Sequence, residues 1–263
     1  MSLALGCTTR PYSDISVADA CSRIAAAGYT DVALFRGAEA SADSTRDQIL
    51  ALRRVVLDAG LGPSMLLGHV DLKRGPEAAL SAYRSLIDNA ALLGARWLLD
   101  LGTDQEALFD TYLEVVRQAA PYAQQAGIGI TLKPHGGITL TSQGLISIHR
   151  RVNHPAFSIC YDPGNIIYYS KGQELPTDHL AEVAPLVKTL IIKDCVVRNG
   201  TPDVMITPGE GMVDFDAVLS VLLAAGFEGP LYLECVGGES LEERDRNVRQ
   251  ALPYLQRILS QLT

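Results

Sequence analysis

Residues 127–137 read GIGITLKPHGG, a short apolar run that breaks into Pro-His-Gly-Gly directly after Lys133. Other apolar runs also end in polar or charged residues: CYDPGN with Asp162 and Asn165, LIIKDC with Lys193 and Asp194, and LYLECVGG with Glu234. Charged side chains at the carboxyl ends of successive parallel strands are how a (β/α)₈ barrel builds its active site. The pattern therefore predicts a fold and the end of it that carries the chemistry.

Apolar runs of strand type alternate with amphipathic helical patterns along the chain. We expect strands at residues 3–8, 31–35, 64–70, 96–101, 127–133, 157–161, 189–194 and 230–235. We expect helices at residues 16–27, 45–59, 77–93, 106–125 and 215–225, each followed by a glycine that can end it in the left-handed conformation. Repeated β-α units predict one α/β domain over residues 1–263, a TIM barrel. A doubly wound open sheet is the alternative, but no GxGxxG follows the first strand.

The composition excludes several classes of protein. The length of 263 residues is close to the ~250 residues of one TIM barrel. A net charge of −8 and a pI near 5.1 argue against a nucleic-acid partner, which needs clustered Lys and Arg. No apolar run approaches the ~20 residues of a membrane span, and no signal-peptide pattern opens the chain. We therefore expect a cytoplasmic protein without a membrane partner.

The five cysteines are scattered and show no CxxC spacing. This usage is typical of a reducing compartment and predicts neither a disulfide nor a zinc site. We expect the cysteines to pack as small buried hydrophobic residues.

Strand alternation indicates which side chains face the barrel interior. Lys133 shares a face with Gly129 and Thr131, Lys193 shares one with Ile191, and Glu234 shares one with Tyr232. If Lys133 and Glu234 face the lumen, Asp162 is close enough to complete a polar cluster at the mouth.

With these motifs, the chain resembles the sugar phosphate isomerase/epimerase superfamily, the xylose isomerase-like TIM barrels, most strongly over residues 127–234. ITLKPHGG is similar to the family's strand-five segment, usually a Glu followed two positions later by His or Asn. CYDPGNIIYY resembles its strand-six Asp segment, and LIIKDC resembles its His-x-Lys-Asp on strand seven. TPGEGMVDF resembles its Gly-x-Gly entry to the next helix, and GPLYLE resembles its terminal Glu strand.

The resemblance implies a Mn²⁺, Mg²⁺, Co²⁺ or Zn²⁺ ion held by Glu, Asp, His and Glu from strands five to eight. This chain has Lys133, Asp162, Ile191 and Glu234 at those positions. Isoleucine cannot coordinate a metal, and a charged ammonium has no lone pair to give. We therefore expect the four-ligand site to be lost. If a divalent metal binds, its ligands would be Asp162, Glu234 and His135.

Lys133 offers a replacement for the ion. Its ammonium, placed between Asp162 and Glu234, could polarise a substrate carbonyl or stabilise an enediolate oxygen. A lysine whose pKa is lowered by burial could instead act as a base or as a Schiff-base nucleophile. A buried salt bridge without chemistry is the third interpretation.

The leading hypothesis is an isomerase or epimerase that abstracts a proton next to the carbonyl of a small carbohydrate or keto-sugar. Glu234 and His135 are candidate bases, and Lys133 and Lys193 are candidate stabilisers of the oxyanion. A lyase would share the first step. An aldolase-type enzyme with a Schiff base on Lys133 or Lys193, and a non-catalytic sugar-binding barrel, are the alternatives. A DNA-repair endonuclease of this fold is disfavoured, because it needs a multinuclear metal site.

The expected partner is a small-molecule carbohydrate, and a homo-oligomer stays open. Candidate substrate-binding residues are His69, Asn165, Asp162 and Arg10, with Arg36 as a further cation after the second strand.

Overall fold

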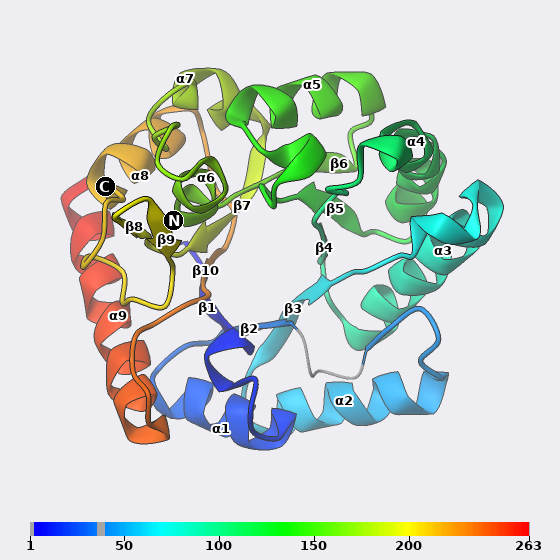
Figure 1. Cartoon of the computed structure of the whole chain (residues 1–263). Coiled ribbons are helices and arrows are strands. Elements are labelled where there is room, and N and C mark those ends of the chain that lie inside the picture. Colours follow the sequence, from blue (N-terminus) through cyan, green and yellow to red (C-terminus); the bar gives the residue numbers. More distant parts are fainter. Residues whose placement is uncertain (1–2, 36–39, 263) are drawn as a thin grey trace.

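The computed structural model describes residues 3–35 and 40–262. Eight parallel strands close into a barrel in the order β1-β10-β7-β6-β5-β4-β3-β2. Viewed along the barrel (Figure 1), the strands form the inner ring and the helices form the outer one. The predicted single-domain α/β TIM barrel is confirmed.

The barrel strands are β1 (Leu5–Thr8), β2 (Asp31–Leu34), β3 (Gly62–Leu67), β4 (Trp97–Asp100), β5 (Gly129–Leu132), β6 (Phe157–Tyr161), β7 (Val187–Ile192) and β10 (Leu231–Leu233). The α-helices are α1 (Val17–Ala26), α2 (Arg46–Asp58), α3 (Pro76–Leu93), α4 (Phe109–Gln125), α5 (Ser142–Val152), α6 (Pro163–Ser170), α7 (Leu180–Val183), α8 (Phe215–Ala224) and α9 (Leu241–Leu262). Short 3₁₀ helices are η1 (Arg10–Tyr12), η2 (Leu72–Arg74), η3 (Glu106–Leu108), η4 (Gly137–Thr139) and η5 (Ala184–Leu186).

Local sequence signals explain where the helices begin and end. At the start of α2, the backbone N–H of Gln48 donates to Thr45 Oγ1, and the backbone N–H of Thr45 donates to Gln48 Oε1 at 2.7 Å. This is a reciprocal capping box. At the end of α3, Gly94 has φ 92° and ψ 13°, the left-handed conformation that glycine adopts without a steric penalty. The glycines predicted to follow the other helices also have positive φ: Gly28, Gly60, Gly127 and Gly226.

The barrel interior is a small core of its own, separate from the larger core between strands and helices. It contains Ala33, Phe35, Met65, Leu99, Cys160, Ile191 and Tyr232. Trp97, the first residue of β4, packs against this cluster and lies so close to Gly129 that a Cβ there would meet the indole at 2.3 Å. The predicted inward facing of Ile191 and Tyr232 is confirmed, and the next inward position on each strand is therefore Lys193 or Glu234.

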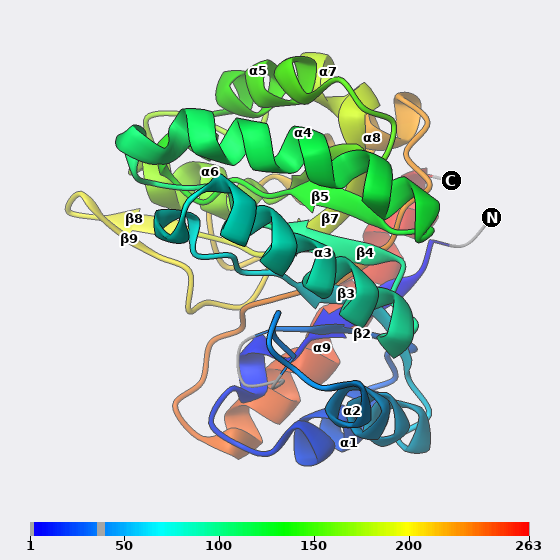
Figure 2. The ribbon, with the colours of Figure 1, turned by 90° about the vertical axis from the view of Figure 1, so that its right-hand side faces the viewer.

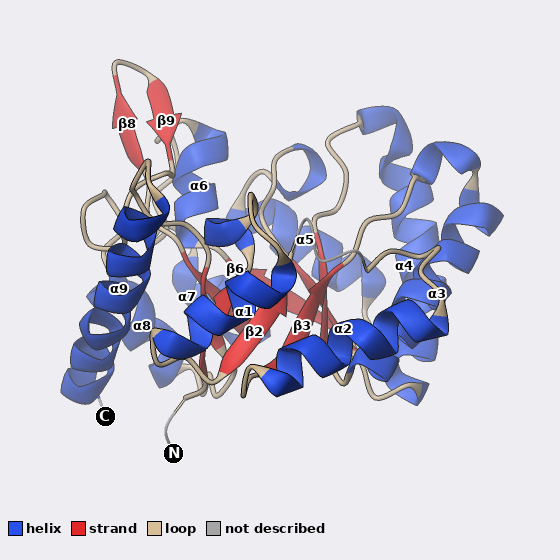
Figure 3. Ribbon diagram, turned by 90° about the horizontal axis from the view of Figure 1, so that it is seen from below, coloured by secondary structure: helices blue, strands red, loops and turns tan. Residues whose placement is uncertain are grey.

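Two features near the site differ from the prediction: the end of β3 and a hairpin after β7. Strand β3 ends at Leu67, so His69 lies in the loop beyond the strand, not just before its end. An unpredicted antiparallel hairpin, β8 (Val196–Arg198) with β9 (Thr201–Asp203), follows β7. Its turn is Asn199-Gly200, and both residues have positive φ. The dipeptide Asn-Gly is the strongest short sequence signal for a hairpin. Figures 2 and 3 show this hairpin at the end of the barrel opposite the two termini.

All five cysteines are free and buried. Among the helices in the described residues, none is long and apolar enough to cross a bilayer.

Candidate active site

Four buried charged side chains meet at the carboxyl rim of the barrel. Each one directly follows a strand: Lys133 follows β5, Asp162 follows β6, Lys193 follows β7, and Glu234 follows β10. These strands are neighbours in the barrel, so their ends lie side by side at one rim. None of the four residues is more than 5% exposed. We call them the lysine–carboxylate cluster.

In this cluster each ammonium bridges both carboxylates. Lys133 Nζ lies 2.9 Å from Asp162 Oδ2 and pairs with Glu234 Oε2. Lys193 Nζ lies 3.3 Å from Asp162 Oδ2 and 2.5 Å from Glu234 Oε1. Two positive and two negative charges therefore alternate, and the cluster is electrically neutral as a whole.

Mutual attraction keeps Glu234 and Lys193 ionised despite their burial. Burial opposes ionisation of Glu234, but Lys133 and Lys193 together lower its pKa to about 2. Burial likewise disfavours the charged form of Lys193, but Asp162 and Glu234 hold its pKa well above the ordinary value. At neutral pH, Glu234 is therefore a weak base. Lys193 lacks the neutral amine that Schiff-base formation needs.

The two lysines differ in how many ammonium protons the protein engages. Lys193 also donates to Asn165 Oδ1 at 3.1 Å, so its ammonium has three side-chain oxygens as neighbours. Lys133 has only its two carboxylate partners among the described residues, and its Nζ lies 5.5 Å from the centroid of the Phe35 ring. One N–H of Lys133 therefore stays available to a ligand.

Asn165 fixes the geometry around the cluster. Its amide nitrogen Nδ2 donates to the Pro134 carbonyl at 2.7 Å, and its backbone N–H donates to Asp162 Oδ1 at 2.9 Å. The second contact makes Asp162 the N-cap of α6. Asn165 thus links the ends of β5, β6 and β7.

A pocket of about 280 Å³ opens above the cluster. Its polar lining is Arg10, Lys133, His135, Asn165, Lys193 and Glu234, and its walls are Phe35, Leu67, Leu101, Tyr168, Tyr169, Val204 and Cys235. The structure brings together most of the predicted site residues here. Asp162 is fully buried and does not line the pocket, so its role is to hold the lysines.

His135 is the uncharged polar group best placed as a base. Its backbone N–H donates to Thr139 Oγ1 at 2.8 Å, and its ring lies 5.0 Å from the Tyr169 ring, centroid to centroid. Burial, and then the charges of Lys133 and Lys193, lower its pKa to about 4. The imidazole is therefore neutral at pH 7. Within the described part of the chain, no group hydrogen-bonds to its ring nitrogens.

His69 does not line this pocket. It is exposed and lines an adjoining hollow that shares Phe35, Leu67 and Leu101 with the pocket and extends to Arg74. A ligand would have to cross those apolar side chains to contact both His69 and the cluster. Arg36 lies outside the described residues.

Comparison with known families agrees with this geometry. The model of the xylose isomerase-like TIM barrels matches residues 21–258. The chain belongs to this family. A search of curated protein sequences gives no match.

Three solved structures with similar folds come from different bacteria. A xylose isomerase-like TIM barrel protein from Mycobacterium smegmatis, in complex with magnesium, is 20% identical with TM-score 0.78, covering 100% of this chain and 98% of that one. A D-allulose 3-epimerase from Methylomonas sp. is 16% identical with TM-score 0.75, covering 97% and 98%. A probable 3-DHS dehydratase from Bacillus anthracis is 14% identical with TM-score 0.74, covering 97% and 99%. At these identities the similarity shows the fold alone.

A divalent metal ion does not fit the donor atoms at this mouth. For a xylose isomerase-like barrel, the expected strand-five ligand is replaced by Lys133, whose ammonium lies between the two remaining carboxylates. The expected strand-seven ligand is replaced by Ile191, which packs in the inner core. Among the described residues, no group of three or more His, Cys, Asp or Glu side chains is placed to hold a metal ion. His135, Asp162 and Glu234 are thus not gathered into such a group.

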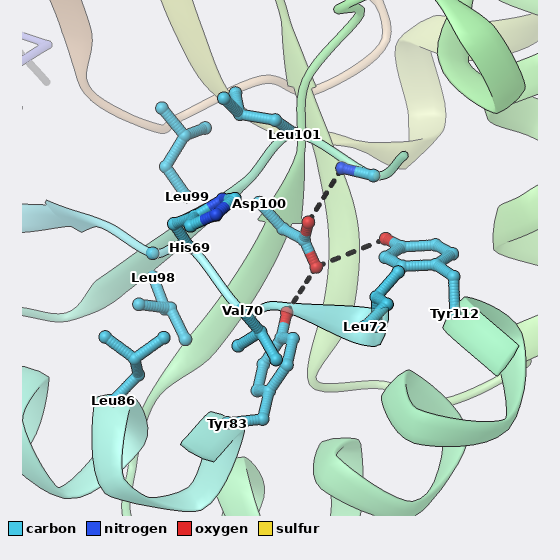
Figure 4. Close-up of a pocket in the computed structure, with 12 residues that line it drawn as sticks. His69, Val70, Leu72, Tyr83, Leu86, Leu98, Leu99, Asp100, Leu101 and Tyr112 are labelled. Atoms are coloured by element: carbon cyan, nitrogen blue, oxygen red, sulfur yellow. Dashed lines mark hydrogen bonds between the residues drawn. The ribbon is translucent and has the colours of Figure 1, made fainter. Parts of the chain in front are cut away.

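Sequence reasoning missed one buried carboxylate near the mouth, Asp100 at the end of β4 (Figure 4). It accepts hydrogen bonds from the Tyr83 hydroxyl, from the Tyr112 hydroxyl at 3.2 Å and from the Gly102 N–H at 2.8 Å. Burial raises its pKa. The adjoining cavity of about 30 Å³ has room for little more than a water molecule. Asp100 therefore anchors β4 to α3 and α4, and the charged end of WLLD was the available signal.

Asp194, beside Lys193, has a structural role. Its carboxylate accepts backbone N–H groups from Cys195, Gly209, Gly211 and Val213 at 2.8–3.0 Å. A Cβ on Gly211 would lie 2.2 Å from Asp194 Oδ1, so the Gly-x-Gly segment is needed for this close approach.

Proposed function

We propose that this protein is an enzyme that abstracts a proton next to the carbonyl of a small carbohydrate or keto-sugar, and that isomerises or epimerises it through an enediolate. One observation carries this proposal. Lys133 holds a buried positive charge between two carboxylates and keeps one N–H for the pocket. The epimerase and dehydratase among the structures of similar fold support an enzyme of this type.

Lys133 supplies the oxyanion stabilisation in this mechanism. As the carbon next to the carbonyl loses its proton, negative charge develops on the carbonyl oxygen. A fixed ammonium in a water-poor site stabilises that charge without having to reorient, which is where preorganised groups contribute most to catalysis. Asp162 and Glu234 hold the ammonium in place.

His135 is the base that the electrostatics favour. Glu234 is held ionised with a pKa of about 2 and has both carboxylate oxygens engaged by lysines. His135 lines the same pocket and is neutral at pH 7, and its ring nitrogens have no hydrogen-bond partner in ranges 3–35 and 40–262. It can take the proton from carbon and return it on the same face to the adjacent carbon while the hydroxyl proton passes to the former carbonyl oxygen, which gives the isomer. Delivery of a proton from solvent to the opposite face of the enediolate, with His135 keeping the one it took, gives the epimer. Lys193 acts as a positioning residue.

The aldolase-type alternative is disfavoured for Lys193, because its amine stays protonated between two carboxylates. A non-catalytic sugar-binding barrel remains the contrasting hypothesis. It predicts binding of a sugar without any transfer of a proton.

Proton exchange with solvent tests the proposal without knowledge of the product. The protein is incubated in D₂O with a panel of five- and six-carbon ketoses and keto acids, and NMR follows the loss of the C–H signal next to the carbonyl. We expect exchange with at least one compound, its loss in His135→Gln and in Lys133→Met, and no change in Arg117→Gln on the exposed face of α4. Binding of a compound without exchange would support the binding barrel. A borohydride-trapped adduct by intact mass would support the Schiff-base enzyme.

A further inference from the structure

Arg10 is a charged residue of the pocket whose side chain has no partner among the residues that the structure describes. The other charged side chains that line the pocket, Lys133, Lys193 and Glu234, are all engaged within the lysine–carboxylate cluster. The Arg10 guanidinium makes no ion pair and no hydrogen bond with any residue in ranges 3–35 and 40–262. Its five N–H donors are therefore available to a ligand.

The net charge of the pocket comes from this residue. The lysine–carboxylate cluster is neutral as a whole, and the neutral His135 adds nothing at pH 7. Arg10 therefore leaves the pocket with one uncompensated positive charge. Arg10 is exposed, so this charge lies where an approaching ligand meets it, and it attracts a ligand of the opposite sign toward the pocket.

The backbone that carries Arg10 is held firmly. On one side, Thr9 donates its N–H to the Ala33 carbonyl at 3.0 Å and accepts the Phe35 N–H at its hydroxyl at 2.9 Å. On the other side, the buried Tyr12 donates its hydroxyl to Asp245 on α9 at 2.9 Å. A rigid carrier reduces the entropy lost when the guanidinium binds a ligand.

At the place where this fold usually binds an anion, backbone N–H groups already donate to a carboxylate of the protein. TIM barrels commonly bind phosphate at the loops after strands seven and eight, next to a helix N-terminus. Here the Glu243 carboxylate accepts the N–H groups of Glu239 and Ser240 at 2.9 and 3.1 Å, at the start of α9. Among the described residues that line the pocket, Arg10 is the cation outside the lysine–carboxylate cluster.

We infer that the substrate of the enolising enzyme proposed above is a keto-sugar that carries an oxyanion, a carboxylate or a phosphate. The guanidinium fork of Arg10 binds two oxygens of that group side by side, while the carbonyl lies against Lys133. Arg10 is a specificity-determining residue, and neutral ketoses are poor ligands.

Isothermal titration of the full-length protein with three matched probes tests this inference. The neutral probe is D-fructose. In 2-keto-D-gluconate a carboxylate replaces the C1 hydroxymethyl group, and in D-fructose 6-phosphate a phosphate is added at the other end. We expect one anionic probe to bind about tenfold or more tighter than D-fructose, the size of one charge-assisted contact. Which of the two does so identifies the source of the oxyanion.

Variants of arginine then assign the preference. Arg10→Gln should bind all three probes with equal affinity, and Arg10→Lys should keep only part of the preference, because an ammonium cannot form the bidentate fork. Arg117→Gln removes the same charge from an exposed helix face and should bind like the wild type. Thermal unfolding of each variant checks that the fold is unchanged.

Equal affinity for the neutral and anionic probes, a preference that survives in Arg10→Gln, or no measurable binding of any probe would each overturn the inference. Titration does not depend on turnover. An Arg10-dependent preference without deuterium exchange would therefore reject the proposed enolisation but support the anion site. Exchange on neutral ketoses alone would support the enolisation and reject the anion site.

Discussion

Lys133 occupies the position between Asp162 and Glu234 where the family resemblance places a metal ion. Two carboxylates brought together in a partly desolvated site repel, and one would become protonated unless a cation lay between them. The ammonium of Lys133 meets this need with its own charge. The chain thus has an ammonium where the resemblance implies a metal ion, and Ile191 where it implies the histidine ligand on strand seven.

Lys133→Glu should convert the mouth into a metal site. The change removes one of the two competing ammonium groups, leaving Lys193, and adds a third carboxylate beside Asp162 and Glu234. Carboxylate oxygens are the donors that Mn²⁺ and Mg²⁺ prefer. In titrations with Mn²⁺ we expect this variant to bind about tenfold or more tighter than the wild type, since affinity rises with the number of charged ligands. Lys133→Met, which removes the ammonium without adding a ligand, is the control. Equal affinities in Lys133→Glu and Lys133→Met would show that the geometry cannot accept an ion.

Glu234→Gln should abolish turnover while the chain still folds. Its amide cannot balance two ammonium groups, so a buried positive charge is left uncompensated. Breaking a buried pair in this way costs about 3–5 kcal/mol of stability. Urea unfolding gives the stability change, and deuterium exchange gives the activity. Glu114→Gln on the exposed face of α4 is the control. Near-normal exchange in Glu234→Gln would mean that the lysines need only one carboxylate.

The acid limb of stability should depend on Glu234. Its pKa falls from the ordinary 4.5 to about 2 on folding, so its contribution is complete above 4.5 and is lost as the pH falls toward 2. Lys193 has a raised pKa, so its contribution persists below its ordinary value of 10.5 and is lost only above it. The stability difference between wild type and Glu234→Gln should therefore shrink from pH 5 to pH 2.5, measured by urea titration. A difference independent of pH in that range would contradict the assignment.

At the scale of elements, the strand ends do most of the positioning. Lys133, Asp162, Lys193 and Glu234 are each the first residue after a strand, so barrel closure alone brings them together. The loop after β7 is shaped differently, by the buried carboxylate of Asp194 gathering four backbone N–H groups. That loop carries Val204, one of the walls of the pocket.

Gly211→Ala should disturb this loop. The new methyl group would lie 2.2 Å from Asp194 Oδ1, too close for the carboxylate and the backbone to keep their hydrogen bonds. We expect a loss of about 1–3 kcal/mol in the free energy of unfolding, the usual size of an overpacking effect. Gly237→Ala is the matched control, because a Cβ there meets its nearest neighbour at 3.5 Å. Equal stability of the two variants would show that the Asp194 loop can relax at no cost.

The sequence predicted these strand ends well because period-two alternation and a terminal charge are local signals. It missed the partners of Asp100, since Tyr83 on α3 and Tyr112 on α4 are ordinary helical residues until the helices pack. It placed His69 on a strand because the apolar run continues to Val70, whereas the pairing with β4 ends at Leu67. The β8–β9 hairpin had a usable Asn-Gly signal, but its strands are only three residues long.

At the scale of the whole molecule, the repeated β-α pattern and the strand-tip charges were enough to predict the barrel and the rim where the lysine–carboxylate cluster lies. They could not show that both lysines bridge both carboxylates, that Lys193 also donates to Asn165, or that the Arg10 side chain has no partner within the described residues. Those facts depend on the relative heights and directions of side chains from four or more strands, which no single stretch of sequence contains. The strands and their charged ends could therefore be predicted from the sequence. The pairing of those charges could not, because it depends on closure of the barrel.

The most direct measurement is deuterium exchange into the substrate after exhaustive treatment of the protein with EDTA and passage over a chelating resin. If the Lys133 ammonium supplies the positive charge at the mouth, the rate of exchange is unchanged by chelation, is not increased by added Mn²⁺, and is lost in Lys133→Met. Loss of exchange on chelation with full recovery on addition of one equivalent of Mn²⁺ would contradict this and restore a metal-dependent mechanism.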